Sequence, residues 1–138
     1  MLKVVFDTNV FVSALISPKG TVGSLFKFAQ KYKLIVSLPL LEEIVQVLTH
    51  PKISRKYEID PEMIQEMLII LKKHSFLASP KKKITILPDS MDNHLLSLAK
   101  ESKADFLVTG DKEILSLKKI NSTKIFSPFQ FLQILKTK

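Results

Sequence analysis

The chain has 138 residues, of which 46% are hydrophobic and 25% charged, and these proportions exclude a disordered or fibrous polypeptide. The absence of cysteine excludes a disulfide framework, a thiolate-bound metal and a cysteine nucleophile. The 21 Lys and Arg against 13 Asp and Glu give a net charge of +8, a balance that favours polyanionic partners.

The length is sufficient for one compact domain with a real hydrophobic core. The longest apolar runs, such as Ile84–Leu87, are far too short to cross a membrane, and Asp7 follows Met1 too closely for a secretory signal peptide. We therefore expect a soluble, cytoplasmic protein whose residues 1–138 form a single domain, with no membrane partner.

Strands alternate with helices along the chain, and a capping residue followed by proline marks two helix starts, at Asp60-Pro61 and Ser127-Pro128. Such alternation implies right-handed crossovers, so we predict an α/β fold with a mainly parallel sheet between layers of helices. In chain order the predicted elements are a strand at Lys3–Asp7, a helix at Val22–Tyr32, a strand at Leu34–Ser37, helices at Leu38–Leu48 (ended by Pro51) and Asp60–His74, a strand at Ile84–Leu87, a helix at Ser90–Glu101, a strand at Asp105–Thr109, a short helix after Asp111, a strand at Lys124–Phe126 and a helix from Ser127 to Leu135.

Two acids, Asp7 and Asp111, follow predicted strands at their carboxyl ends. In open parallel sheets these ends share one edge, where binding sites form, so both side chains can face one crevice. Asp105 begins its strand at the opposite edge and is excluded. The alternative for Asp111 is a helix N-cap, and the alternative for Asp7 is a turn residue that bonds its own backbone.

Asp92 lies within the apolar face of the predicted helix Ser90–Glu101, because Leu95, Leu96 and Ala99 follow it at helical spacing. A carboxylate in such a face needs a partner or a metal. The alternative is a capping box in which Asp89 is the N-cap. We expect the opposite face of this helix to be polar and exposed, with Asn93, Ser97 and Lys100 on it and His94 at the surface.

The helix Leu38–Leu48 carries two further acids, Glu42 and Glu43. Both flank its apolar face, so helical periodicity does not choose between them. The alternative is that both are surface acids near a helix N-terminus.

Carboxylates packed closely together repel one another unless a cation lies among them. Hard oxygen ligands without thiolate or paired imidazole suit Mg²⁺ or Mn²⁺, and such ions promote phosphodiester hydrolysis. Other catalytic patterns are missing, since there is no phosphate-binding glycine loop and no H-E-x-x-H. Neither Ser13 nor Ser37 has a base at a suggestive spacing.

The lysines form only three clusters, Lys72-Lys73, Lys81–Lys83 and Lys118-Lys119. Each is a candidate contact to nucleic acid phosphates, and the alternative for each is a solvated loop or helix face that keeps the protein in solution.

Four segments resemble the PIN-domain family in the expected order, and the resemblance spans essentially the whole chain. Within the family the chain most resembles the branch of toxins from toxin–antitoxin systems. The matching segments are Val4-Val5-Phe6-Asp7-Thr8-Asn9, Leu40-Leu41-Glu42-Glu43-Ile44, Asp89-Ser90-Met91-Asp92-Asn93-His94-Leu95-Leu96 and Leu107-Val108-Thr109-Gly110-Asp111.

The resemblance implies an endoribonuclease that binds Mg²⁺ or Mn²⁺ through Asp7, Glu43, Asp92 and Asp111. It favours Glu43 over Glu42, and it implies that Asn9 and Thr109 orient the carboxylates or the attacking water. It further implies an RNA substrate, a homodimer and a cognate antitoxin protein.

Three functions follow from these observations. The first is the ribonuclease toxin, the second a PIN-type RNA-processing or structure-specific nuclease without a toxin role, and the third a catalytically silent RNA-binding or interaction module. The four intact acids argue against the silent module. A neighbouring small reading frame for a DNA-binding antitoxin would separate the first function from the second.

Overall fold

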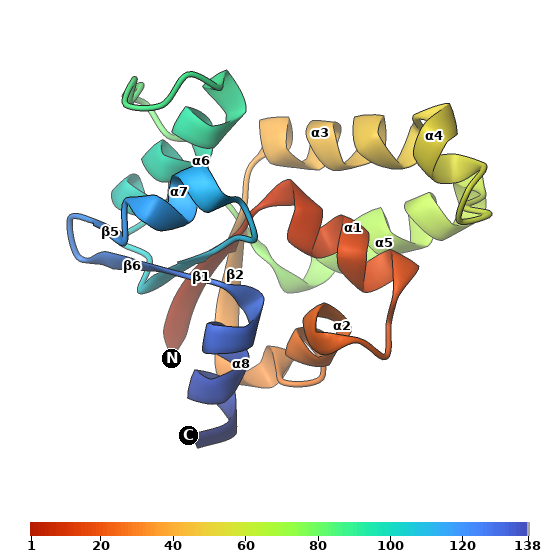
Figure 1. The fold of residues 1–138 in the computed structure, drawn as a ribbon, viewed down its shortest axis with the longest axis horizontal. Helices are drawn as coiled ribbons and strands as arrows, with labels where there is room; N and C mark the ends of the chain where they lie inside the picture. The colour runs from red at the N-terminus through yellow and green to blue at the C-terminus, as the bar shows by residue number, and fades with distance from the viewer. Residues whose placement is uncertain (138) are drawn as a thin grey trace.

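The computed structural model describes residues 1–137, and Lys138 at the end of the predicted domain lies outside the described residues. The fold is α/β, as predicted, with helices flanking a mostly parallel sheet (Figure 1). The strands are β1 (Leu2–Phe6), β2 (Tyr32–Val36), β3 (Phe76–Leu77), β4 (Phe106–Val108), β5 (Lys119–Ile120) and β6 (Thr123–Phe126). The helices are α1 (Thr8–Ile16), α2 (Thr21–Phe26), a 3-10 turn at Ala29–Lys31, α3 (Leu38–Thr49), α4 (Pro51–Ser54), α5 (Pro61–His74), α6 (Ser90–Glu101), α7 (Lys112–Ser116) and α8 (Pro128–Thr137).

The strand order is β3-β2-β1-β4-β6-β5; four of the strand pairs are parallel, and the β5–β6 pair is antiparallel. The chain therefore moves from β1 toward one edge of the sheet and then returns to build the other half from β4. The carboxyl ends of β1 and β4 flank this change of direction, which is where open parallel sheets bind ligands. In Figure 1 this point lies between α6 and α7 on one side and α1 and α3 on the other.

The core beneath this edge is aromatic and apolar. Phe6, at the end of β1, is completely buried and contacts the rings of Phe11, Phe26, Tyr32 and Phe131 at centroid distances of 5.6–6.1 Å. These rings come from four separate elements, so they fix β1 against α1, α2 and α8.

The predicted helix Val22–Tyr32 is wrong in its second half. Helix α2 ends at Phe26, a 3-10 turn follows, and Tyr32 is the first residue of β2. The reason is that Tyr32 pairs with Leu2 in the sheet while its hydroxyl donates to the Leu25 carbonyl oxygen at 2.9 Å. Four further elements, α1, α4, β3 and β5, were not predicted from the sequence.

The predicted strand Ile84–Leu87 is also wrong, because these residues lie in an extended loop beside α6. Their backbone groups bond to side chains of that helix instead of to a neighbouring strand. The Ile84 N–H donates to Ser97 Oγ at 3.0 Å, and the N–H groups of Ile86 and Leu87 donate to Asn93 Oδ1 at 3.1 and 2.8 Å.

The two capped helix starts are confirmed. Asp60 Oδ1 accepts from the Met63 N–H at 3.0 Å, and Ser127 Oγ accepts from the Gln130 N–H at 3.2 Å. Within residues 1–137, no helix combines the length and the apolar character needed to cross a bilayer.

Candidate active site

The first two predicted site residues meet at the carboxyl ends of β1 and β4. Asp7 follows β1 directly, and its backbone N–H donates to the Val108 carbonyl oxygen at 2.9 Å. Thr109, Gly110 and Asp111 follow β4. The parallel register of these strands, which pairs Phe6 with Val108, therefore brings together two acids that lie far apart in the sequence.

Thr109 connects the two acids. Its fully buried hydroxyl donates to Asp7 Oδ2 at 2.7 Å and accepts from the Asp111 N–H at 3.0 Å. Asp7 is only 6% exposed, and burial raises the pKa of its carboxyl, while the bond from Thr109 opposes that rise. The orienting contact expected of Thr109 is present in the structure.

Asp111 is the helix N-cap that the sequence offered as one alternative, and it also lies at the cavity that contains Asp7. Its Oδ1 caps α7 by accepting from the N–H groups of Glu113 at 2.8 Å and Ile114 at 3.3 Å. The same side chain lines the cavity that contains Asp7. Capping thus fixes the carboxylate at the cavity wall and does not remove it from the site.

Asp89 and Asp92, at the start of α6, differ in what they bond. Asp89 is the N-cap, because its Oδ1 accepts from the N–H groups of Met91 at 2.8 Å and Asp92 at 3.0 Å. Asp92 is half-buried in the same cavity. Burial, followed by the charges of Asp89, Asp111 and Asp7, raises the pKa of Asp92 to about 6.

The structure separates the two glutamates that periodicity could not. Glu43 lines the cavity, and its Oε2 accepts a short hydrogen bond from the Thr8 hydroxyl. Glu42 is exposed and lies at a different pocket, which residues of α3 and α5 line. Sequence reasoning did not single out Thr8; the only signal was its place directly after Asp7.

We call this space the acid cavity. Its volume is about 210 Å³, and Asn9 lies at it with an exposed side chain. Across residues 1–137, no three His, Asp or Glu side chains stand close enough together to form a metal site as they are placed. The predicted acids therefore share one cavity without converging on one point. The residues that line it are Asp7, Thr8, Asn9, Glu43, Val47, Asp89, Met91, Asp92 and Asp111.

The prediction that the polar face of α6 is exposed is wrong for most of its residues. Asn93 and Ser97 are buried beneath the 79–89 loop, and only Lys100 of the three is exposed. His94 is half-buried, not at the surface, and its Nε2 lies 2.7 Å from the hydroxyl of Ser37. Ser37 therefore does have an imidazole partner, which the sequence separation of 57 residues concealed.

The chain is similar to a known protein family and to a protein of an archaeon. The model of the PIN domain family matches residues 3–113. An uncharacterized protein of Methanocaldococcus jannaschii is 34% identical over 142 residues, covering 96% of this chain and 90% of that protein.

Among solved structures, the fold is similar to a chain in the crystal structure of VapBC2 from Rickettsia felis bound to a DNA fragment from their promoter. The TM-score is 0.62 at 19% sequence identity, and the match covers 91% of this chain and 98% of that chain.

Proposed function

Because the chain belongs to the PIN domain family, whose members are generally nucleases, we propose that it is a metal-dependent endoribonuclease that hydrolyses RNA phosphodiester bonds. The proposal extends to residues 1–138 as one nuclease domain. The observation that carries it is the acid cavity, in which Asp7, Glu43, Asp92 and Asp111 come from four different parts of the fold to one small space.

The donor set of the cavity fits a hard divalent cation. Its candidate ligands are carboxylates, with no thiolate and no imidazole among the residues that line it, and oxygen donors suit Mg²⁺ or Mn²⁺. Burial and neighbouring like charges raise the pKa values of Asp7 and Asp92, because both make the charged carboxylates less stable. A cation bound among the carboxylates would stabilise their charged forms. We propose Asp7, Glu43, Asp92 and Asp111 as its ligands.

When bound, such an ion activates water and stabilises the negative charge that develops on the phosphate. The protein's own residues orient the carboxylates. Thr109 holds Asp7 and the Asp111 backbone, and Thr8 holds Glu43. Asn9 is exposed beside the cavity, and we propose that it orients the carboxylates or the attacking water.

We propose a role as the toxin of a toxin–antitoxin pair, acting in the cytoplasm as a homodimer with a cognate antitoxin. Two observations support this role: the similarity of fold to a chain of the VapBC2 complex, and the net charge of +8, which attracts a polyanion. An RNA-processing nuclease without an antitoxin has the same site. A small antitoxin reading frame beside the gene distinguishes the two.

The test is cleavage of a panel of defined RNA and DNA oligonucleotides in Mg²⁺, Mn²⁺ or EDTA. We expect cleavage of RNA only with a divalent cation. Asp7→Asn, purified in the same way, controls for contaminating nucleases and should be inactive. RNA cleavage that is undiminished in EDTA, or equal in the variant, would refute the proposal.

A second readout does not depend on activity. A cation that binds only the folded protein at 100 times its dissociation constant stabilises it by about 2.7 kcal/mol. Mn²⁺ should therefore raise the melting temperature of the wild type by several degrees, and it should raise that of Asp7→Asn much less. An equal rise in both proteins would exclude Asp7 as a ligand.

A further inference from the structure

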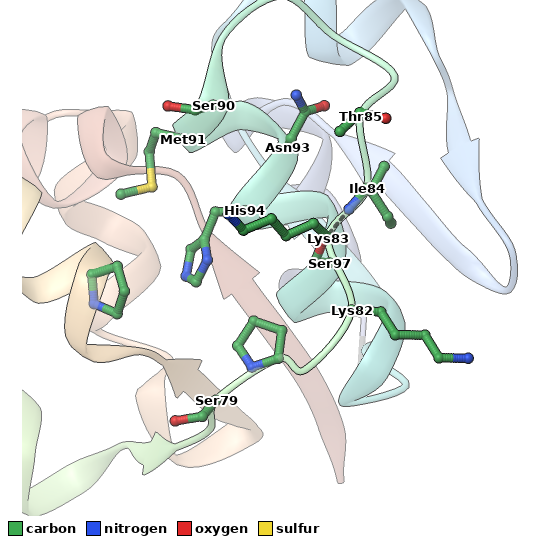
Figure 2. Close-up of a pocket in the computed structure, with 12 residues that line it drawn as sticks. Ser79, Lys82, Lys83, Ile84, Thr85, Ser90, Met91, Asn93, His94 and Ser97 are labelled. Carbon is green, nitrogen blue, oxygen red and sulfur yellow. Dashed lines mark hydrogen bonds between the residues drawn. The ribbon is translucent and has the colours of Figure 1, made fainter.

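A second, larger cavity adjoins the acid cavity along the first turns of α6, and we call it the α6 pocket. It has a volume of about 610 Å³ and is bounded by the start of α3, the 79–85 segment and residues 90–97 of α6 (Figure 2). Met91 lines both cavities, so the two are direct neighbours. The volume falls within the range of about 300–1,000 Å³ that is typical of small-molecule sites.

Most of the surface that lines the α6 pocket is apolar. Pro39, Pro80, Ile84 and Met91 line it, together with the imidazole of His94. Among these side chains the imidazole is the planar one on which an unstacked nucleobase can stack, and the others offer apolar contact beside it.

His94 is held in one orientation. Ser37 is completely buried, and its Oγ accepts from the Leu40 N–H at 3.2 Å while it lies 2.7 Å from His94 Nε2. When the serine hydroxyl donates to Nε2, the neutral imidazole carries its hydrogen on Nδ1. The other ring nitrogen, Nδ1, is not used by Ser37 and can bond to a ligand in the pocket, as a donor or an acceptor according to the tautomer.

The basic side of the α6 pocket is held by bonds to the helix. The Glu101 carboxylate accepts from the N–H groups of Lys81 at 2.8 Å and Lys82 at 2.9 Å, and Ser97 accepts from Ile84. Lys82 and Lys83 are exposed and line the pocket. In Figure 2 the side chain of Lys83 extends from the loop over the pocket, whereas that of Lys82 points away from it.

We propose that the α6 pocket binds a nucleotide of single-stranded RNA next to the phosphate at the acid cavity. Lys83 contacts the backbone phosphate of this nucleotide, Lys82 adds to the local positive charge, and His94 contacts the base. This inference rests on the proposed function, because a phosphate at the acid cavity places the adjoining nucleotide within reach of the pocket. The acid cavity alone repels a polyanion, so a basic contact close by is needed to hold the strand.

The test measures binding separately from cleavage. Fluorescence anisotropy of a labelled single-stranded RNA 12-mer of mixed sequence is recorded in EDTA at several salt concentrations. Lys82→Ala/Lys83→Ala should weaken binding by about fivefold or more and lower the salt slope by about 1. The matched control is Lys72→Ala/Lys73→Ala, which removes the same charge from the exposed face of α5, outside the α6 pocket, and should change affinity less than about twofold.

His94→Gln tests the base contact, because glutamine can still bond to Ser37 but lacks the ring. Its relative affinities for oligo(A), oligo(U), oligo(C) and oligo(G) should change by about threefold or more, while the salt slope stays constant. Thermal melts confirm that all variants are folded.

An equal loss of RNA affinity in Lys82→Ala/Lys83→Ala and Lys72→Ala/Lys73→Ala would overturn the inference. An unchanged base preference in His94→Gln would overturn it as well. If the wild type cleaves RNA and either result is obtained, the proposed function stands and the α6 pocket has no such role. If the pocket variants lose RNA binding but the wild type cleaves nothing, the pocket is supported and the nuclease proposal is refuted. A wild-type protein that cleaves RNA with a divalent cation but binds none of these RNAs in EDTA would overturn the inference and leave the proposed function standing.

Discussion

The acid cavity and the α6 pocket share Met91 but are built in different ways. The acid cavity lies where strands end, and its carboxylates are held by Thr8, Thr109 and the start of α7. The α6 pocket lies under a loop whose backbone is bonded to side chains of α6. One region concentrates negative charge on the sheet edge, and the other presents rings and lysines beside it.

Under the two proposals above, chemistry takes place in the acid cavity and binding in the neighbouring α6 pocket. Changes in the acid cavity should affect the reaction and leave the fold intact, because they remove repulsion between like charges. Changes beneath the 79–89 loop should affect the fold and the binding of RNA first, because they leave partly buried backbone groups of the loop without partners.

The largest expected effect separates the two acids at the start of α6. Asp92→Asn removes a charge from the acid cavity and should lower single-turnover RNA cleavage by about 100-fold or more, since a metal-bound site contributes several kcal/mol to catalysis. The melting temperature in EDTA should stay constant or rise. Asp89→Asn retains an equally good N-cap and should keep cleavage within about threefold of wild type. Near-normal cleavage by Asp92→Asn, or a loss of cleavage in Asp89→Asn alone, would show that Asp92 is the wrong choice between the two acids.

A smaller effect concerns the support of the loop. Asn93 is 9% exposed and bonds to three backbone groups. Its Oδ1 accepts from the N–H groups of Ile86 and Leu87, and its Nδ2 donates to the Leu87 carbonyl oxygen at 2.7 Å. Asn93→Ala should lower the free energy of unfolding by about 2 kcal/mol and increase proteolysis within the 79–89 loop. Urea denaturation and limited proteolysis measure both.

The matched control for this change is Ser97→Ala, which removes the acceptor of only one backbone bond and should cost about 1 kcal/mol. If Asn93→Ala proved no more destabilising than Ser97→Ala, the loop would not depend on Asn93 as the structure indicates.

The smallest effect is a pH dependence confined to the acid cavity. The pKa of Asp92 is raised from 3.8 to about 6, so between these values the folded apo protein binds more protons than the unfolded chain. Stability from this group therefore increases as the pH falls through about 6 and is lost as the pH rises. Asp92 is partly exposed, so solvent screening limits the gain to about 1 kcal/mol or less.

The measurement compares melting temperatures of wild type and Asp92→Asn in EDTA at pH 5.5 and 7.5. The wild type should gain more stability at the lower pH than the variant does. His94 is present in both proteins, so the opposite effect of its lowered pKa cancels in the difference. The same change in both proteins would show that Asp92 does not titrate in this range.

Much of the fold was predictable because its signals are local. The caps at Asp60 and Ser127 and the helix with Leu95 and Leu96 on its inner face follow from a few neighbouring residues. Helix α1 was not predicted, because Val10, Phe11 and Val12 form a short continuous apolar run, and such a run does not distinguish a helix from a strand. The segment Ile84–Leu87 has strand-like composition, but its bonding partners on α6 cannot be read from composition.

In the candidate site too, some features were predictable from the sequence and others were not. Asp7 and Asp111 were placed together because the ends of parallel strands meet at one edge, and their shared cavity agrees with that expectation. The contact of Thr8 with Glu43 and that of Ser37 with His94 join residues 35 and 57 positions apart. Neither pair lies within one element, so no periodicity links its two members.

The central place of β1 in the sheet has a consequence for the timing of synthesis. Asp7 is made early, but its neighbours Thr109 and Asp111 come from the far side of β4, about 100 residues later. At a translation rate of about 5–20 residues per second, the acid cavity is incomplete for roughly 5–20 seconds after Asp7 is made. A nascent chain whose residues up to Val36 have folded holds Asp7 without Thr109 or Asp111. The order of the strands therefore delays the assembly of all four acids until most of the chain has been synthesised.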